Sequence, residues 1–131
     1  MYVEDDADTR ELVSLVLARA GYEVVVADNP EQAARLAQTA SFDLYLIDNW
    51  MPGTSGIELC RKLREYEAQT PILFYLGAAQ EQDKRAAFAV GAQGYLTKPV
   101  SIDELLIEIS GLISEFRSAR LAADLAGEIV I

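Results

Sequence analysis

Residues 44–53 of the chain read Leu44-Tyr45-Leu46-Ile47-Asp48-Asn49-Trp50-Met51-Pro52-Gly53. The first four of these residues form a short, continuous apolar run, which is typical of a parallel-sheet strand buried on both faces. Asp48 closes that run just before a turn that carries Pro52 and Gly53. In open α/β sheets, the carboxyl ends of the strands face the ligand site. The pattern therefore favours a carboxylate that projects into a binding site, although a carboxylate before a turn can also serve only as a cap.

Strand-like and helix-like segments alternate along the chain. The predicted strands cover residues 1–3, 23–27, 44–48, 72–76 and 94–96, and the predicted helices cover residues 7–20, 30–38, 55–66, 80–90 and 102 onwards. Local signals support the boundaries, because Asn29 precedes a proline, Ser101 and Glu104 form a capping box, and Gly21 and Gly91 follow helices. Five βα units with short connections predict an α/β fold, with a parallel sheet, helices on both faces and right-handed crossovers.

Composition excludes several classes of function. The 131 residues fit one domain, and a net charge of −10 with only three lysines argues against a nucleic-acid surface. The absence of histidine removes Ser-His-Asp and Cys-His catalysis. No apolar stretch is long enough to span a membrane, and no signal peptide opens the chain. The single cysteine, Cys60, lies on an apolar helical stripe and is expected in the core, which is compatible with a cytoplasmic protein.

The ends of the predicted strands carry matching chemistry. Glu4 and Asp5 follow the first strand, Asp48 ends the third, and Lys98 follows the fifth. Carboxylates that share a site repel one another unless a cation neutralises them. Mg²⁺ takes oxygen ligands, keeps several waters and uses one or two protein carboxylates together with phosphate oxygens. We therefore expect a pocket for Mg²⁺ and for a phosphoryl group on or beside Asp48, with Lys98 as a second positive charge.

Three motifs together resemble the receiver domain of two-component response regulators. They are Val3-Glu4-Asp5-Asp6, Leu46-Ile47-Asp48-Asn49-Trp50-Met51-Pro52-Gly53-Thr54-Ser55-Gly56 and Tyr95-Leu96-Thr97-Lys98-Pro99, within a resemblance that runs from Tyr2 to about Phe116. The resemblance implies a doubly wound, flavodoxin-like five-stranded sheet of order 2-1-3-4-5. It implies a signalling protein and not an enzyme, although one that assists its own phosphorylation and dephosphorylation.

The resemblance also implies roles for single residues. Asp48 would accept a phosphoryl group from a sensor histidine kinase or a phosphotransfer protein. The Mg²⁺ ligands would be Asp5, Asp48 and the backbone carbonyl of Trp50, with Glu4 acting largely through water. Lys98 would contact Asp48 and the phosphoryl oxygens, and its bond to Pro99 would be cis. Two further residues are included by the resemblance: Asp6, which would face away from the metal, and Tyr95, which would be the aromatic switch residue.

One position departs from the family pattern. In the family, the residue at the end of the fourth strand is usually Ser or Thr, whose hydroxyl takes part in the switch. Counted back from Lys98, this position is Leu76 here, and Gly77 follows it. Leucine donates no hydrogen bond, and a hydrogen bond to a charged group contributes roughly 1.5–3 kcal/mol. The alternative function is therefore a degenerate receiver that binds protein partners without phosphorylation.

The remaining expectations concern boundaries and partners. Residues 1–117 are expected to form the receiver domain, and residues 118–131 to prolong the last helix, add a strand at Glu128–Ile131, or fray as a tail. Signalling, including a possible homodimer, would use the last two helices and the fifth strand, with Ala89, Gln93 and Tyr95 on that surface.

Two enzyme alternatives fit poorly. A dehalogenase-type phosphatase needs an aspartate where Trp50 stands, and a flavin site needs a different loop from the acidic one after the first strand.

Overall fold

The computed structural model describes residues 1–48, 56–77 and 81–129. The strands are β1 Tyr2–Val3, β2 Val26–Ala27, β3 Tyr45–Asp48, β4 Ile72–Gly77 and β5 Gly94–Lys98, and the helices are α1 Ala7–Arg19, α2 Pro30–Thr39, α3 Gly56–Tyr66, α4 Glu81–Ala89 and α5 Ile102–Ile129. All paired strands run parallel, in the order β2-β1-β3-β4-β5. The predicted doubly wound sheet and its strand order are confirmed.

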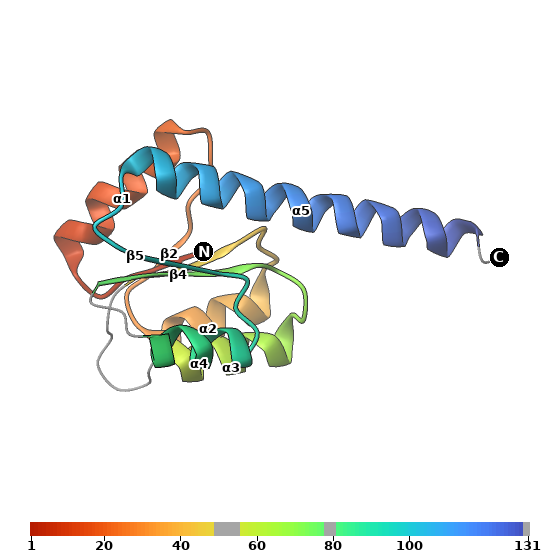
Figure 1. Ribbon diagram of the computed structural model, residues 1–131, viewed down its shortest axis with the longest axis horizontal. Helices are drawn as coiled ribbons and strands as arrows, with labels where there is room; N and C mark the ends of the chain where they lie inside the picture. The colour runs from red at the N-terminus through yellow and green to blue at the C-terminus, as the bar shows by residue number, and fades with distance from the viewer. Residues whose placement is uncertain (49–55, 78–80, 130–131) are drawn as a thin grey trace.

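Helices cover both faces of the sheet (Figure 1). Helices α1 and α5 lie on one face, and α2, α3 and α4 lie on the other. Because side chains alternate along a strand, neighbouring residues feed two separate cores. Leu46 and Leu73 pack toward α1 and α5, whereas Ile47 and Phe74 pack toward α2, α3 and α4. Full burial of each such side chain contributes roughly 1.5–3 kcal/mol, so the sheet that carries the strand ends is firmly held.

Local capping signals account for most helix boundaries. The Asn29 side chain accepts a hydrogen bond from the Gln32 amide at 2.7 Å, and the Ser101 hydroxyl accepts one from the Glu104 amide at 3.1 Å. Gly21 and Gly91 adopt φ angles of 98° and 107°, in the left-handed region that glycine tolerates best. The expected cap residues and helix stops are therefore confirmed.

Two strands differ from the predicted length by more than one residue. The strand expected at residues 23–27 contains only Val26 and Ala27, because β2 lies at the sheet edge and pairs only with the two residues of β1. The strand expected at residues 94–96 continues to Lys98, because β5 pairs with β4 as far as Gly77. The extra length of β5 matters for function, since it brings Lys98 onto the sheet edge.

Helix α5 continues well beyond the sheet (Figure 1). It runs without interruption from Ile102 to Ile129, so residues 118–129 are helical. The alternative strand at Glu128–Ile131 is wrong for Glu128 and Ile129, and the last two residues lie outside the described part of the chain. None of the helices in the described ranges combines the length and the apolar character that a membrane crossing requires.

Candidate functional site

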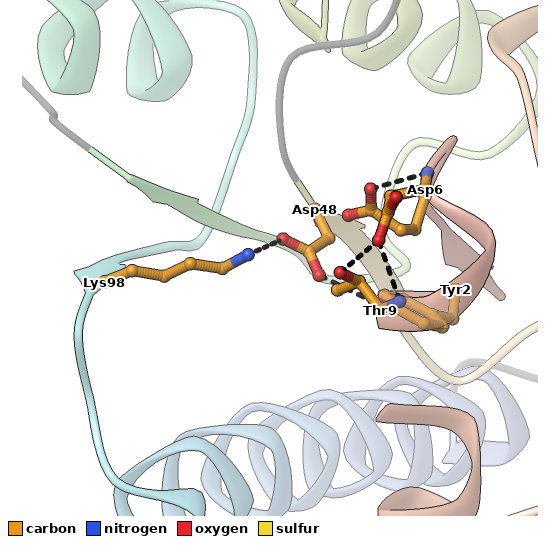
Figure 2. A network of polar contacts seen from close by, with 6 residues as sticks. Tyr2, Asp6, Thr9, Asp48 and Lys98 are labelled. Atoms are coloured by element: carbon orange, nitrogen blue, oxygen red, sulfur yellow. Dashed lines mark hydrogen bonds and ion pairs between the residues drawn. The ribbon is translucent and has the colours of Figure 1, made fainter. Parts of the chain in front are cut away.

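Asp48 lies at the centre of a polar cluster at the carboxyl edge of the sheet. It ends β3, and none of its surface is exposed. The ammonium Nζ of Lys98, from β5, lies 2.6 Å from Asp48 Oδ1 (Figure 2). The same ammonium lies 4.7 Å from the centre of the Tyr75 ring, on the neighbouring strand β4. The fold therefore brings the expected acceptor carboxylate and the expected lysine into direct contact.

The second carboxylate oxygen of Asp48, Oδ2, forms a hydrogen bond with Tyr2. The Tyr2 hydroxyl donates this hydrogen bond to Asp48 Oδ2 at 2.7 Å (Figure 2). Burial is the largest cause that raises the pKa of Tyr2, and the charge of Asp48 and the hydrogen bond to it raise this pKa further. The hydroxyl therefore keeps its proton and stays a donor. Sequence reasoning treated this residue only as part of the first strand. The available signal was a tyrosine on a central strand, because a buried phenol requires a hydrogen-bond partner.

Glu4 is a fully buried carboxylic acid beside Asp48. Its Oε1 accepts a hydrogen bond from the Asp6 amide at 3.0 Å, whereas its Oε2 is buried without a partner among the described residues. Burial raises the pKa of Glu4 to about 8. The Asp6 amide opposes this rise, and the neighbouring carboxylates of Asp48 and Asp5 add to it. Glu4 is therefore predominantly protonated at neutral pH as long as no cation lies beside it.

Asp5 and Asp6 have different surroundings. A buried oxygen of Asp5, Oδ1, lacks a hydrogen-bond partner in the described part of the chain. Asp6 is exposed and caps α1, where its Oδ2 accepts hydrogen bonds from the Thr9 amide and hydroxyl at 2.9 and 2.6 Å. Arg10 supports this loop by donating to the Glu4 carbonyl at 2.9 Å. Asp6 is thus engaged with the helix, whereas Asp5 keeps a free carboxylate oxygen.

The cluster has the donor chemistry that Mg²⁺ prefers. Glu4 Oε2 and Asp5 Oδ1 are unpartnered carboxylate oxygens in the described residues, and such buried atoms are costly without a hydrogen bond or a cation. Across the described residues, no group of three acidic, histidine or cysteine side chains is arranged to hold a metal by itself. Mg²⁺ commonly binds one or two carboxylates and fills its other positions with water and phosphate oxygens. The residues present fit such an ion.

A substitution at Glu4 should change the pH dependence of stability. Because its pKa is about 8 in the folded chain and 4.5 ordinarily, the folded state binds more protons between these pH values. The unfolding free energy of the metal-free protein should therefore fall as pH rises through this window, by on the order of a few kcal/mol. Glu4→Gln should flatten the decline in urea denaturation at successive pH values. Glu11→Gln, at an exposed position on α1, is the matched control, and equal slopes in both variants would refute the expectation.

The residues expected to switch lie at the ends of β4 and β5. Leu76 is buried in the core on the α2, α3 and α4 face, in the same cluster as Phe74. Tyr95 is half-buried and stacks on Phe74, with ring centres 5.9 Å apart. Gly77 pairs with Lys98 in the sheet, and the Lys98–Pro99 peptide bond is cis, as expected. Leu76 thus belongs to the hydrophobic core and presents no polar group to the site.

One expected metal ligand lies outside the described residues. The backbone carbonyl of Trp50 belongs to residues 49–55, which the structure does not describe, and the same holds for residues 78–80 after β4. The described site therefore consists of Tyr2, Glu4, Asp5, Asp48 and Lys98.

Comparison with known families identifies this arrangement. The sequence model of the response regulator receiver domain matches residues 1–110. The chain belongs to this family. The receiver domain shares 37% identity over 115 residues with the phosphate regulon transcriptional regulatory protein PhoB of Pseudomonas aeruginosa. The aligned region covers 86% of this chain and 50% of that protein.

Solved structures agree with the family assignment. The Vibrio cholerae chemotaxis protein CheY4 superimposes with a TM-score of 0.80 at 34% identity, covering 85% of this receiver domain and 94% of that chain. The receiver domain of the Francisella response regulator 1452 also gives a TM-score of 0.80, at 30% identity, covering 87% of this chain and 94% of that one.

The chain spans about half the length of the curated relatives it matches first. Those relatives are named transcriptional regulators. The net charge of −10 therefore argues against nucleic-acid binding only for the receiver domain itself, and the expectation that no nucleic acid is a partner does not extend to a whole regulator.

Proposed function

We propose that this receiver domain accepts a phosphoryl group on Asp48 from a phosphohistidine of a sensor kinase or a phosphotransfer protein. The observation that carries this proposal is the 2.6 Å contact between Lys98 and Asp48, next to the unpartnered oxygens of Glu4 and Asp5. A buried carboxylate at a strand end, with a cation on one side and free oxygen ligands on the other, has the parts that phosphoryl transfer requires.

The chemistry divides among a few side chains. A lone pair of the Asp48 carboxylate forms a bond to phosphorus, the phosphorus–nitrogen bond of the donor breaks, and its electron pair stays on the donor imidazole. Lys98 neutralises charge on the phosphoryl oxygens. Asp5 and Asp48 would hold Mg²⁺, with Glu4 acting through water and the Trp50 carbonyl completing the set. The bound ion would supply further charge neutralisation.

Reversal of the signal uses the same groups. A water oxygen bonds to phosphorus, the bond to Asp48 breaks, and its electron pair returns to the carboxylate while the water proton passes to solvent. The domain thereby assists its own phosphorylation and dephosphorylation as a signalling protein and does not turn over an external substrate. We propose a cytoplasmic location for this activity, with which the single free cysteine, Cys60, is compatible.

The direct test uses a small phosphodonor in place of the unidentified kinase. The protein is incubated with acetyl phosphate and Mg²⁺, and its intact mass is followed. We expect one phosphoryl adduct that requires Mg²⁺ and is strongly reduced in Asp5→Ala, because Asp5 supplies a free carboxylate oxygen. Asp8→Ala, at an exposed position on α1, is the matched control. No Mg²⁺-dependent adduct from acetyl phosphate or beryllofluoride would refute phosphoryl acceptance.

The second candidate is a degenerate receiver that binds protein partners without phosphorylation. The burial of Leu76 in the core supports it, because the position offers no hydroxyl to a phosphoryl oxygen. In that case Asp48 can still take the phosphoryl group while the surface response is weak. The adduct test and the conformational response therefore separate the two candidates.

Restoring the hydroxyl at this position should strengthen the response. Leu76→Thr supplies a hydrogen-bond donor to the phosphoryl group and frees space in the core next to Phe74. The beryllofluoride-induced NMR shifts around Tyr95 should be larger in the variant than in the parent chain. Leu76→Val is the control for lost volume without a hydroxyl. Equal shifts in all three proteins would count against a switch limited by Leu76.

We propose that the signal leaves through α4, β5 and α5. Ala89 and Gln93 are exposed, and Tyr95 is half-buried on this side. Gln93 also supports the fold, because its side-chain oxygen accepts a hydrogen bond from the Ile72 amide at 2.8 Å. The partners here would be proteins, including a second copy of the chain. We assign residues 1–117 to the receiver domain and residues 118–131 to its C-terminal extension.

A further inference from the structure

Both oxygens of Asp48 have close polar partners on other strands. Lys98 contacts Oδ1 at 2.6 Å, and the Tyr2 hydroxyl contacts Oδ2 at 2.7 Å (Figure 2). Tyr2 is 1% exposed, and its side chain lies in the core under α1 and α5 with Leu46 and Leu105. Because the ring is packed on all sides, the hydroxyl has little freedom to turn away. The acceptor carboxylate is therefore held from two directions.

The strength of the Tyr2 contact depends on the charge of its acceptor. A hydrogen bond to an ionised oxygen is about twice as strong as one to a neutral oxygen. In the free chain Oδ2 belongs to a carboxylate. After phosphorylation the negative charge lies on the phosphoryl oxygens, and Oδ2 is neutral whether it becomes the carbonyl oxygen or the bridging oxygen. The Tyr2 hydroxyl thus stabilises the free carboxylate more than it stabilises the aspartyl phosphate.

We propose that Tyr2 is a positioning residue that holds the Asp48 carboxylate in one orientation and shifts the balance from the phosphorylated chain toward the free one. This inference rests on the proposed function of Asp48. Tyr2, which lies on β1 next to the phosphorylation site, would thereby help to determine how long the signal lasts.

The Tyr2 hydrogen bond should have opposite effects on the rates of phosphorylation and of hydrolysis. With acetyl phosphate as donor, an Asp48 lone pair forms the bond to phosphorus, the donor phosphorus–oxygen bond breaks, and its electron pair leaves with acetate. The Tyr2 hydrogen bond weakens as the carboxylate loses charge, so it slows this step. In hydrolysis, water bonds to phosphorus and the electron pair of the breaking bond returns to Asp48. The hydrogen bond strengthens as that charge returns, so Tyr2 speeds this step.

The test is Tyr2→Phe, which keeps the ring and removes only the hydroxyl. Protein phosphorylated with acetyl phosphate and Mg²⁺ is freed of donor, and loss of the adduct is followed by intact mass. We expect adduct loss to slow about tenfold, from the difference between charged and neutral hydrogen bonds, and the steady-state phosphorylated fraction to rise. Tyr45→Phe is the matched control, because Tyr45 is 1% exposed on β3 and packs in the opposite core.

A measurement without metal or donor checks the contact itself. The carbon NMR signal of Tyr2 Cζ should move when Asp48→Asn replaces the ionised acceptor with a neutral amide, whereas the Tyr45 signal should stay in place. Equal rates of adduct loss in Tyr2→Phe and wild type, or an unmoved Tyr2 signal, would overturn the role of Tyr2 and leave phosphorylation of Asp48 intact. If wild type forms no adduct at all, the proposed function fails and this inference fails with it.

Discussion

Asp48→Asn should abolish the Mg²⁺-dependent phosphoryl adduct completely. The amide has no anionic lone pair to form the bond to phosphorus. Of the other carboxyl groups in the described site, Glu4 is held in the protonated form by a pKa of about 8, and Asp5 would hold Mg²⁺. Intact mass after incubation with acetyl phosphate measures the loss. Peptide mapping then shows whether any residual adduct lies elsewhere.

The same variant should fold at least as well as the parent chain. In the metal-free protein, the substituted amide removes a buried charge, and its oxygen can still accept the Tyr2 hydrogen bond. Thermal unfolding followed by circular dichroism should therefore give an unchanged or higher midpoint. An adduct that persists in a folded Asp48→Asn protein would contradict the assignment of the acceptor, whereas adduct loss together with unfolding would make misfolding the cause.

Lys98→Met should have the largest effect on stability. Asp48 is completely buried, and its Oδ1 has the Lys98 ammonium 2.6 Å away, whereas the lysine side chain is itself 29% exposed. Removing the cation leaves a buried carboxylate without its counter-charge, which should lower the unfolding free energy of the metal-free protein by about 3 kcal/mol. Phosphorylation by acetyl phosphate should slow by about a hundredfold, because a charge that stabilises the transition state is lost.

A double-mutant cycle makes this expectation specific. If Lys98→Met lowers the unfolding free energy because Asp48 is left as an unpaired buried charge, then adding Asp48→Asn should recover most of the lost unfolding free energy. Lys62→Met, at an exposed position on α3, controls for the loss of any lysine. Urea denaturation of the four proteins of the cycle provides the measurement. A double variant as unstable as Lys98→Met alone would show that the lysine acts through packing and not through Asp48.

Local sequence signals predicted the elements of the fold well. The four-residue apolar run before Asp48, the cap residues Asn29 and Ser101, and the glycines at 21 and 91 all act within one turn or one strand, and the structure confirms each of them. The lengths of β2 and β5 could not be predicted in the same way. An edge strand extends only as far as its neighbour offers partners, and that neighbour lies far away in the sequence.

Arg64 illustrates a structural residue without a local signal. It lies on α3, and its guanidinium donates to the Thr70 carbonyl at 2.6 Å, to the Gly91 carbonyl at 2.7 Å and to the Gln93 side chain at 2.5 Å. Arg64 thereby joins the segment before β4 to the segment before β5. In the sequence it is one of eight scattered arginines, and none of its neighbours marks it.

Three features of the site are properties of short segments and can be predicted without the fold: Asp48 ends a buried strand, acidic residues follow the first strand, and Lys98 precedes a proline. The contact between the Tyr2 hydroxyl and Asp48, 46 residues apart, and the packing of Leu76 into the core become visible only in the folded chain. The direction of a side chain and its partner depend on strand register and on which core each strand face fills. These follow from the packing of the whole sheet, so the environment of the acceptor carboxylate is a property of the assembled fold.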